Sequence, residues 1–80
     1  MRIRYFAGAA EAAGVAEETI ESDFEVTVAE LVEQLGSERE RLAKVLAVST
    51  LLVDGHPAHA RTEFVGPGAQ VDVLPPFAGG

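Results

Sequence analysis

The sequence predicts an α+β domain in which one helix covers one face of a small sheet. Two segments near the start of the chain alternate apolar and polar residues, as strands do. A clearly marked amphipathic helix follows, and two or three strand-like segments complete the chain. Because the 80 residues contain no repeat and no linker, we expect a single domain over residues 1–80, with a flexible tail at 75–80.

The first half of the chain predicts two strands. Residues 1–7 alternate Met1, Ile3, Tyr5 and Ala7 with Arg2, Arg4 and Phe6. The small residues of 8–14 are compatible with either a loop or a short helix. Residues 18–24 alternate again, and we expect them to form a hairpin with the first strand.

The main helix is predicted from its start signal. Thr27 and Glu30 have the spacing of a capping box. We expect Gly36 to end the helix in a left-handed conformation. A second box at 37–40 predicts another, shorter helix. The apolar faces of the two helices are Val28, Leu31, Val32 and Leu35 for the first, and Leu42, Val45 and Leu46 for the second.

The second half of the chain predicts the remaining strands. Residues 50–53 form a strand that ends in the turn Asp54-Gly55. Residues 56–64 are irregular, with room for one edge strand, and 66–68 form another turn. Residues 70–74 form the last strand, which Pro75 ends because it has no amide hydrogen for a ladder. The sheet therefore has four to five strands.

Composition excludes several kinds of function. The chain has no cysteine, which excludes disulfides, thiolate metal sites and a cysteine nucleophile. Its net charge of −7 disfavours nucleic acid as a partner. No apolar stretch is long enough to span a bilayer, and no signal peptide is apparent, so we expect no membrane partner and a cytoplasmic location.

Strand parity predicts a surface for a partner. Phe6 shares a face with Arg2 and Arg4, and Leu74 shares a face with Asp72, so both are apolar residues on faces that are otherwise polar. A single exposed apolar side chain is normal. If the first and last strands are neighbours, however, Phe6, Leu74 and Phe77 form one patch beside the tail, which favours an interface.

The ending of the chain predicts its chemistry. Pro75 and Pro76 reduce the freedom that the tail loses when it docks. Ala78 and Gly79 are small enough to pass through a narrow channel, and Gly80 would deliver a terminal carboxylate to a partner's active site. A carboxylate is a poor electrophile, so the partner must activate it, most simply as an acyl-adenylate made from ATP. The acyl group can then accept sulfur or an amine.

The segments 74–80, 3–7, 27–31 and 52–55 resemble the ubiquitin-like sulfur carriers of the ThiS/MoaD family, most closely the small subunit of molybdopterin synthase. The resemblance implies a β-grasp fold with parallel first and last strands. It implies that Gly80 is adenylated, converted to a thiocarboxylate and used to donate sulfur to a pterin precursor of molybdenum cofactor. Phe6, Leu74, Pro75, Pro76 and Phe77 would contact partners.

The implied partners are the large subunit of molybdopterin synthase and a ubiquitin-activating-type adenylyltransferase. The carrier would be non-catalytic alone, would bind no cofactor stably, and would depend on ATP used by the activating enzyme. In one departure, Ala9 and Ala10 occupy a stretch where many relatives carry a basic residue.

Other functions stay open at this stage. The carrier could serve thiazole (thiamine) or cysteine synthesis instead. It could be a protein modifier joined to lysines through Gly80, or an interaction domain that only shares the fold. His56 and His59 lack a third metal ligand, so we expect no metal site. Lys44, the only lysine, is expected to be an ordinary surface cation rather than an attachment site.

Overall fold

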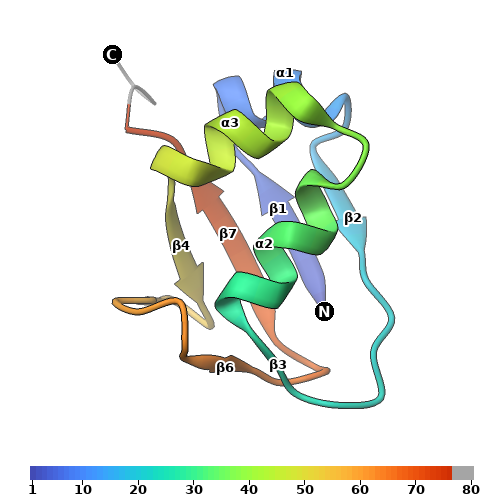
Figure 1. Cartoon of the computed structure of the whole chain (residues 1–80), viewed down its shortest axis with the longest axis vertical. Helices are drawn as coiled ribbons and strands as arrows, with labels where there is room; N and C mark the ends of the chain where they lie inside the picture. The colour runs from blue at the N-terminus through green and yellow to red at the C-terminus, as the bar shows by residue number, and fades with distance from the viewer. Residues whose placement is uncertain (77–80) are drawn as a thin grey trace.

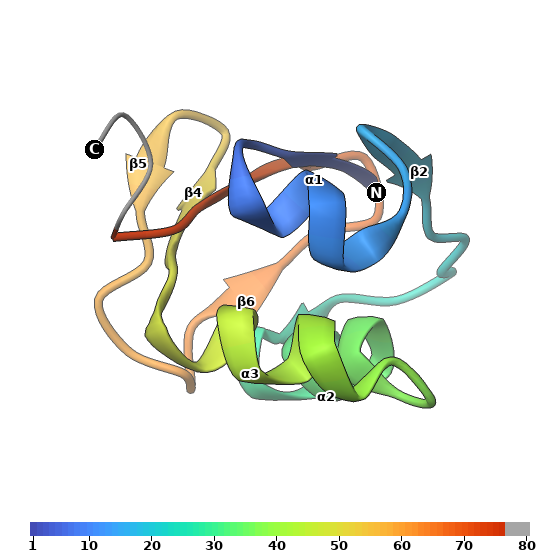
Figure 2. The same ribbon diagram turned by 90° about the horizontal axis from the view of Figure 1, so that it is seen from above.

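The computed structural model describes residues 1–76, and Figure 1 shows a twisted sheet with helices on one side. The sheet has five strands in the order β2-β1-β7-β4-β5. Seen from above, helices α2 and α3 form a layer of their own beneath the sheet (Figure 2). The elements of this main sheet are β1 (Arg2–Tyr5), β2 (Glu17–Thr19), β4 (Thr50–Val53), β5 (His56–Pro57) and β7 (Gln70–Leu74).

The first and last strands lie side by side at the centre of the sheet. They run parallel, with Ile3 paired to Val71 and Tyr5 paired to Val73. Strand β2 pairs antiparallel with β1, and β4 pairs antiparallel with β7. A parallel central pair flanked by antiparallel strands, covered by a helix on one face, is the β-grasp arrangement that the sequence predicts.

Three helices and a second small sheet complete the fold. The helices are α1 (Gly8–Ala13), α2 (Val28–Gly36) and α3 (Glu40–Val48). Strands β3 (Val26–Thr27) and β6 (Phe64–Val65) pair antiparallel below the main sheet. The expectation of one main helix and one short helix is wrong, because α2 and α3 each have nine residues. The open question at 8–14 is answered by α1.

The core lies between the sheet and the helices. The largest side chains that are completely buried come from both layers. Full burial of each aliphatic side chain contributes about 1.5–3 kcal/mol, which makes this layer contact the main source of stability. The largest completely buried side chains are Ile3, Val71 and Val73 from the sheet, Leu31, Leu35, Leu42 and Leu46 from the helices, and Val65 from β6.

Helix α2 begins as predicted but ends differently. The Thr27 hydroxyl oxygen accepts the Glu30 amide at 3.1 Å, and the Glu30 carboxylate accepts the Thr27 amide at 2.8 Å, so the capping box is present. Gly36 is not left-handed: within residues 1–76 only Gly14 and Gly55 are glycines with positive φ. Gly36 is instead needed for close approach, because a Cβ atom there would lie 2.9 Å from the Cβ of Ala43.

Two further sequence expectations need correction. The prediction of a second capping box is wrong, because the N-cap residue of α3 is Arg39, whose side chain makes no capping hydrogen bond. The second strand is much shorter than residues 18–24, since β2 covers only Glu17–Thr19. Ile20 still exchanges hydrogen bonds with Met1, but beyond it the chain leaves β1 to reach β3, so the alternation of residues 21–24 has no neighbouring strand. The turn at Asp54 and Gly55 is confirmed, with φ values of 49° and 84°.

Candidate functional site

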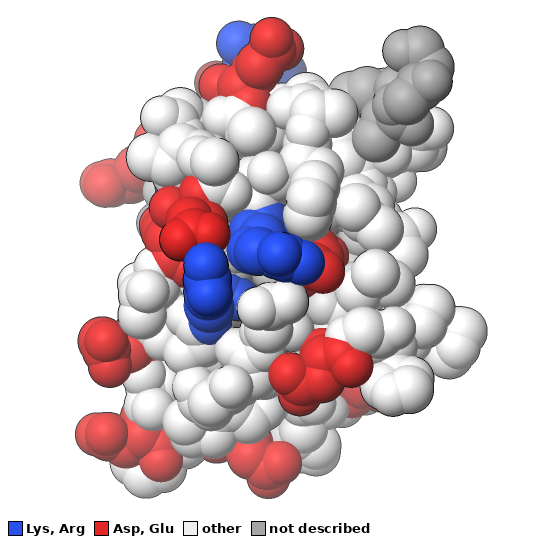
Figure 3. All heavy atoms as spheres, turned by 180° about the vertical axis from the view of Figure 1, so that it is seen from behind, with Lys and Arg blue, Asp and Glu red and all other residues white. Residues whose placement is uncertain are grey.

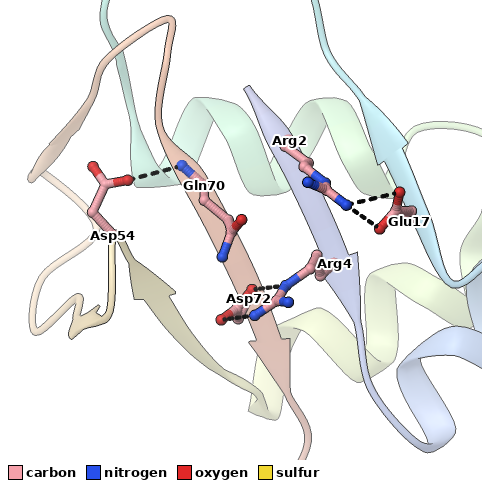
Figure 4. A network of polar contacts seen from close by, with 6 residues as sticks. All are labelled: Arg2, Arg4, Glu17, Asp54, Gln70 and Asp72. Carbon is pink, nitrogen blue, oxygen red and sulfur yellow. Dashed lines mark hydrogen bonds and ion pairs between the residues drawn. The ribbon is translucent and has the colours of Figure 1, made fainter.

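The sheet face opposite the helices is open, and it carries the predicted partner surface. Alternation along β1 and β7 places Ile3, Tyr5, Val71 and Val73 in the core, which leaves the intervening residues on the open face. Figure 3 shows this face from behind, with basic side chains gathered near its middle and acidic side chains mostly around its margin. The polar side chains rise from neighbouring strands (Figure 4).

An ion pair joins the two central strands on this face. Arg4 of β1 and Asp72 of β7 are in register. Arg4 Nε donates to Asp72 Oδ1 at 2.8 Å and Arg4 Nη2 donates to Oδ2 at 3.1 Å, as Figure 4 shows. This side-chain hydrogen bond is the main cause of the raised pKa of Arg4. A paired fork of this kind holds the guanidinium plane in one orientation.

Phe6 lies against this pair. The Cζ atom of Arg4 is 5.4 Å from the centre of the Phe6 ring, which is within the range of a cation–π contact. Phe6 is 37% exposed, and its amide donates to the Val73 carbonyl at 3.2 Å, so the parallel ladder continues one residue beyond β1. The predicted placement of Phe6 on the same face as Arg4 is therefore confirmed.

Leu74 completes the apolar part of the surface. It is partly buried, and it pairs with Thr50 on the neighbouring strand. Because Tyr5 pairs with Val73, the parallel register places Leu74 beside Phe6. The structure thus brings together the two residues that strand parity singled out. We call Arg4, Phe6, Asp72 and Leu74 the tail-proximal surface.

The backbone beside this surface is strained. Ala7 has φ 49° and ψ −125°, a conformation that residues with a side chain rarely adopt. The turn is closed by the Ala9 amide, which donates to the Phe6 carbonyl at 3.0 Å. This turn directs the chain from β1 into α1 immediately after Phe6. The strained residue therefore directly follows Phe6 in the chain.

The tail begins at the end of β7. Pro75, which the sequence assigns to the flexible tail and to the partner contacts, is buried, whereas Pro76 is exposed. The predicted site residues Phe77, Ala78, Gly79 and Gly80 lie outside the described residues. The strand that carries Asp72 and Leu74 therefore leads directly into the tail, with Pro75 covered by its surroundings.

Sequence reasoning missed Arg4 and Asp72 as members of the site. Alternation places both on the polar face, but it does not indicate that they pair. The available signal was their opposite charge on the outward faces of two strands that the family resemblance already predicted to be parallel neighbours. Buried polar side chains almost always have partners, so a nearly buried Asp72 requires one.

Other locations give weaker candidates. Residues 1–76 contain no group of three side chains that could hold a metal ion. His56 is exposed on β5, and His59 and Arg61 line a hollow of about 140 Å³ beside Ser49. Lys44 is exposed on α3. Among the described residues, no helix is long and apolar enough to cross a membrane.

Comparison with protein families decides the identification. The sequence model of the ThiS family matches residues 3–80, which is almost the entire chain. The chain belongs to the ThiS family. The identification made from the terminal motif and the three internal segments is therefore confirmed. A comparison of this ThiS-family protein with curated proteins gives no match.

Solved structures agree with this assignment. The putative molybdopterin converting factor, subunit 1, from Pyrococcus furiosus is 28% identical, with a TM-score of 0.81 and coverage of 94% of each chain. SAMP1 from Haloferax volcanii is 26% identical, with a TM-score of 0.81 and coverage of 100% of this chain and 98% of that one. Small archaeal modifier protein 1 from H. volcanii is 25% identical, with a TM-score of 0.79 and coverage of 95% of each chain.

Proposed function

We propose that this ThiS-family protein is a sulfur carrier that acts as the small subunit of molybdopterin synthase. The observation that carries the proposal is the position of the tail-proximal surface at the end of β7. Phe6 and Leu74 stand beside the point where the chain leaves the fold. A partner that contacts this surface would also receive the residues that lead to Gly80.

The proposed chemistry takes place on the carboxyl group of Gly80. Its oxygen attacks the α-phosphate of ATP, which releases pyrophosphate and leaves an acyl-adenylate. Sulfide-level sulfur (HS⁻) from a donor then attacks the acyl carbon, breaks its bond to AMP and loses its proton, which gives a thiocarboxylate and free AMP. Neither step needs an acid or a base from this chain. In this proposal both reactions take place in the active site of the activating enzyme, which also binds the ATP. The carrier itself contributes an accessible acyl group and a docking surface.

Two partners follow from this proposal. A ubiquitin-activating-type adenylyltransferase would activate Gly80. The large subunit of molybdopterin synthase would then accept the tail in its active site, where the thiocarboxylate would donate sulfur to a pterin precursor of molybdenum cofactor. Both would meet the chain in the cytoplasm. Full burial of Phe6 and Leu74 would contribute about 2 kcal/mol each before the costs of association.

A second function is supported by the match to small archaeal modifier protein 1. In that case the acyl group of Gly80 would be transferred to the amino group of a lysine, forming an amide. The molybdopterin converting factor subunit and SAMP1 match this chain with the same TM-score, 0.81. The sequence identity is slightly higher for the converting factor subunit, 28% against 26%. The ending Pro-Pro-Phe-Ala-Gly-Gly favours the molybdopterin assignment.

Intact mass spectrometry tests the proposal. The chain is incubated with the adenylyltransferase, ATP and a sulfur source. We expect a mass increase equal to the difference between sulfur and oxygen, and sulfur transfer in a reconstituted synthase. A variant with one residue appended after Gly80 serves as the matched control: it should fold normally and show neither product. Sulfur transfer by this variant would contradict the chemistry, and a ladder of conjugates would favour the modifier.

A further inference from the structure

We infer that Arg4 is a preformed carboxylate-binding group within the tail-proximal surface, and that the activating adenylyltransferase presents an Asp or Glu side chain to it. This inference rests on the proposed function, because it concerns how that partner recognises the carrier. Phe6 and Leu74 would supply apolar contact, and Arg4 would supply the polar contact between partner and carrier.

Any partner that covers Phe6 must also cover Arg4. The guanidinium lies 5.4 Å from the centre of the Phe6 ring. Its hydrogen-bond partner Asp72 is two residues before Leu74 on the strand that leads into the tail. A protein surface that holds the tail and buries Phe6 therefore removes water from the guanidinium as well. The chemistry that the partner must offer follows from the donors that Arg4 has left.

Asp72 uses only part of the guanidinium. Of its five N–H groups, one on Nε and one on Nη2 donate to Asp72. Arg4 side-chain nitrogens make no other hydrogen bond within residues 1–76. Because the group is planar, the two N–H groups of Nη1 and the second one of Nη2 point away from Asp72. Burying these donors without acceptors would cost free energy comparable to several lost hydrogen bonds.

A carboxylate is the acceptor that fits this edge best. Nη1 and Nη2 form a fork that matches two carboxylate oxygens, and such charge-assisted bonds are about twice as strong as neutral ones. The side chain of Arg4 is 39% exposed, whereas that of Asp72 is 13% exposed, so an approaching partner meets the cation first. Asp72 and the Phe6 ring already hold the guanidinium, which reduces the ordering cost of binding.

Binding measurements on the full chain test the inference. We expect Arg4→Gln to raise the Kd for the adenylyltransferase at least ~10-fold, because a charge-assisted fork is lost. Arg4→Lys should weaken binding similarly, because Lys has no planar fork, although it retains the charge. The matched control is Arg2→Gln: Arg2 faces Glu17 at the other end of β1 and should alter the Kd less than ~3-fold.

A double variant guards against a folding defect. Arg4→Gln leaves Asp72 nearly buried without its cation, which lowers stability. Replacing both residues by Leu removes the charges together, so this protein should fold and still bind at least ~10-fold more weakly. On the partner, exchanging the matching Asp or Glu for Lys should restore binding to Arg4→Glu. Restoration by a charge swap would not occur if the acceptor were a backbone carbonyl.

The outcomes separate this inference from the proposed function. ATP–pyrophosphate exchange with the unaltered chain tests activation of Gly80 itself, and its absence would remove both ideas. If the unaltered chain supports ATP–pyrophosphate exchange but Arg4→Gln and the double Leu variant bind with an unchanged Kd, the role of Arg4 is overturned and the proposed function stands. The role of Arg4 is also overturned if no exchange of a partner Asp or Glu for Lys restores binding to Arg4→Glu.

Discussion

Single residues of the tail-proximal surface have separate physical roles. Arg4 and Asp72 pair across the central strands at 2.8 and 3.1 Å, which orients the guanidinium. The Phe6 ring lies under that guanidinium, 5.4 Å from its Cζ to the ring centre, and stays 37% exposed. Ala7 then reverses the chain through a strained turn. The surface is thus held by local contacts on both sides of Phe6, so substitutions at Phe6 and at Ala7 should have different effects.

Phe6→Arg should weaken binding to the activating enzyme at least ~10-fold, because an exposed aromatic anchor is replaced by a charge. The free energy of unfolding should change by about 1 kcal/mol or less, since the residue lies at the surface. Calorimetric binding and thermal melting measure the two effects on the same sample. A large drop in melting temperature would instead assign Phe6 to the core.

Ala7→Gly should stabilise the isolated protein by about 1 kcal/mol. Glycine adopts positive φ without a steric penalty, and the relief of strain exceeds the extra entropy of the unfolded chain. Denaturant unfolding measures the change, with Ala12→Gly in α1 as the control that should destabilise. If Ala7→Gly lowers the stability instead, the turn conformation is not strained.

At the scale of elements, two helices illustrate different requirements. The start of α2 is determined locally, because Thr27 and Glu30 satisfy each other's backbone groups. Hydrogen bonds from Thr27, the backbone one first, also lower the pKa of Glu30. The last residue of α2 meets a requirement set by a neighbour, because α3 approaches Gly36 too closely for a side chain.

Gly36→Ala should therefore destabilise the fold by about 1–3 kcal/mol, even though alanine is the better helix former. The added Cβ would lie 2.9 Å from the Ala43 Cβ and 3.1 Å from its Cα, so the two helices must move apart. Combining Gly36→Ala with Ala43→Gly should recover part of the loss in thermal melting. A single variant as stable as the original chain would show that α3 moves without cost.

At the scale of the whole molecule, a partly buried polar network connects the sheet to the helical layer. The Tyr5 hydroxyl of β1 donates to Glu18 at 2.6 Å, and Arg39 beside α3 donates to the same carboxylate oxygen at 2.9 Å. Burial is the main cause that raises the pKa of Tyr5, and the hydrogen bond to Glu18 adds to it.

This network predicts a loss of stability in alkali. A group with a raised pKa in the folded state contributes fully below its unfolded value, and the contribution is lost as the pH rises through the folded value. The free energy of unfolding should therefore fall above about pH 10. Tyr5→Phe should show a smaller fall over the same range, measured by denaturant titration at several pH values. Parallel curves for the two proteins would contradict this assignment.

Much of the fold follows from local signals in the chain. Alternation predicted β1 and β7, the capping box predicted the start of α2, and Asp54-Gly55 predicted the hairpin of β4 and β5, because each signal acts within a few residues. The length of β2 and the role of Gly36 could not be predicted in this way. Both depend on contacts between segments that are brought together only when the chain folds, and local sequence signals do not specify such contacts.

The features of the candidate site also fall into those that local sequence patterns predict and those that depend on contacts between distant segments. The amino-acid sequence alone is enough to assign the family, the outward placement of Phe6 and Leu74, and the order of residues that ends at Gly80. The pairing of Arg4 with Asp72, the position of the Phe6 ring beside Arg4 and the burial of Pro75 become apparent only in three dimensions. Parity states which face a side chain occupies, whereas an ion pair requires the register between strands nearly 70 positions apart.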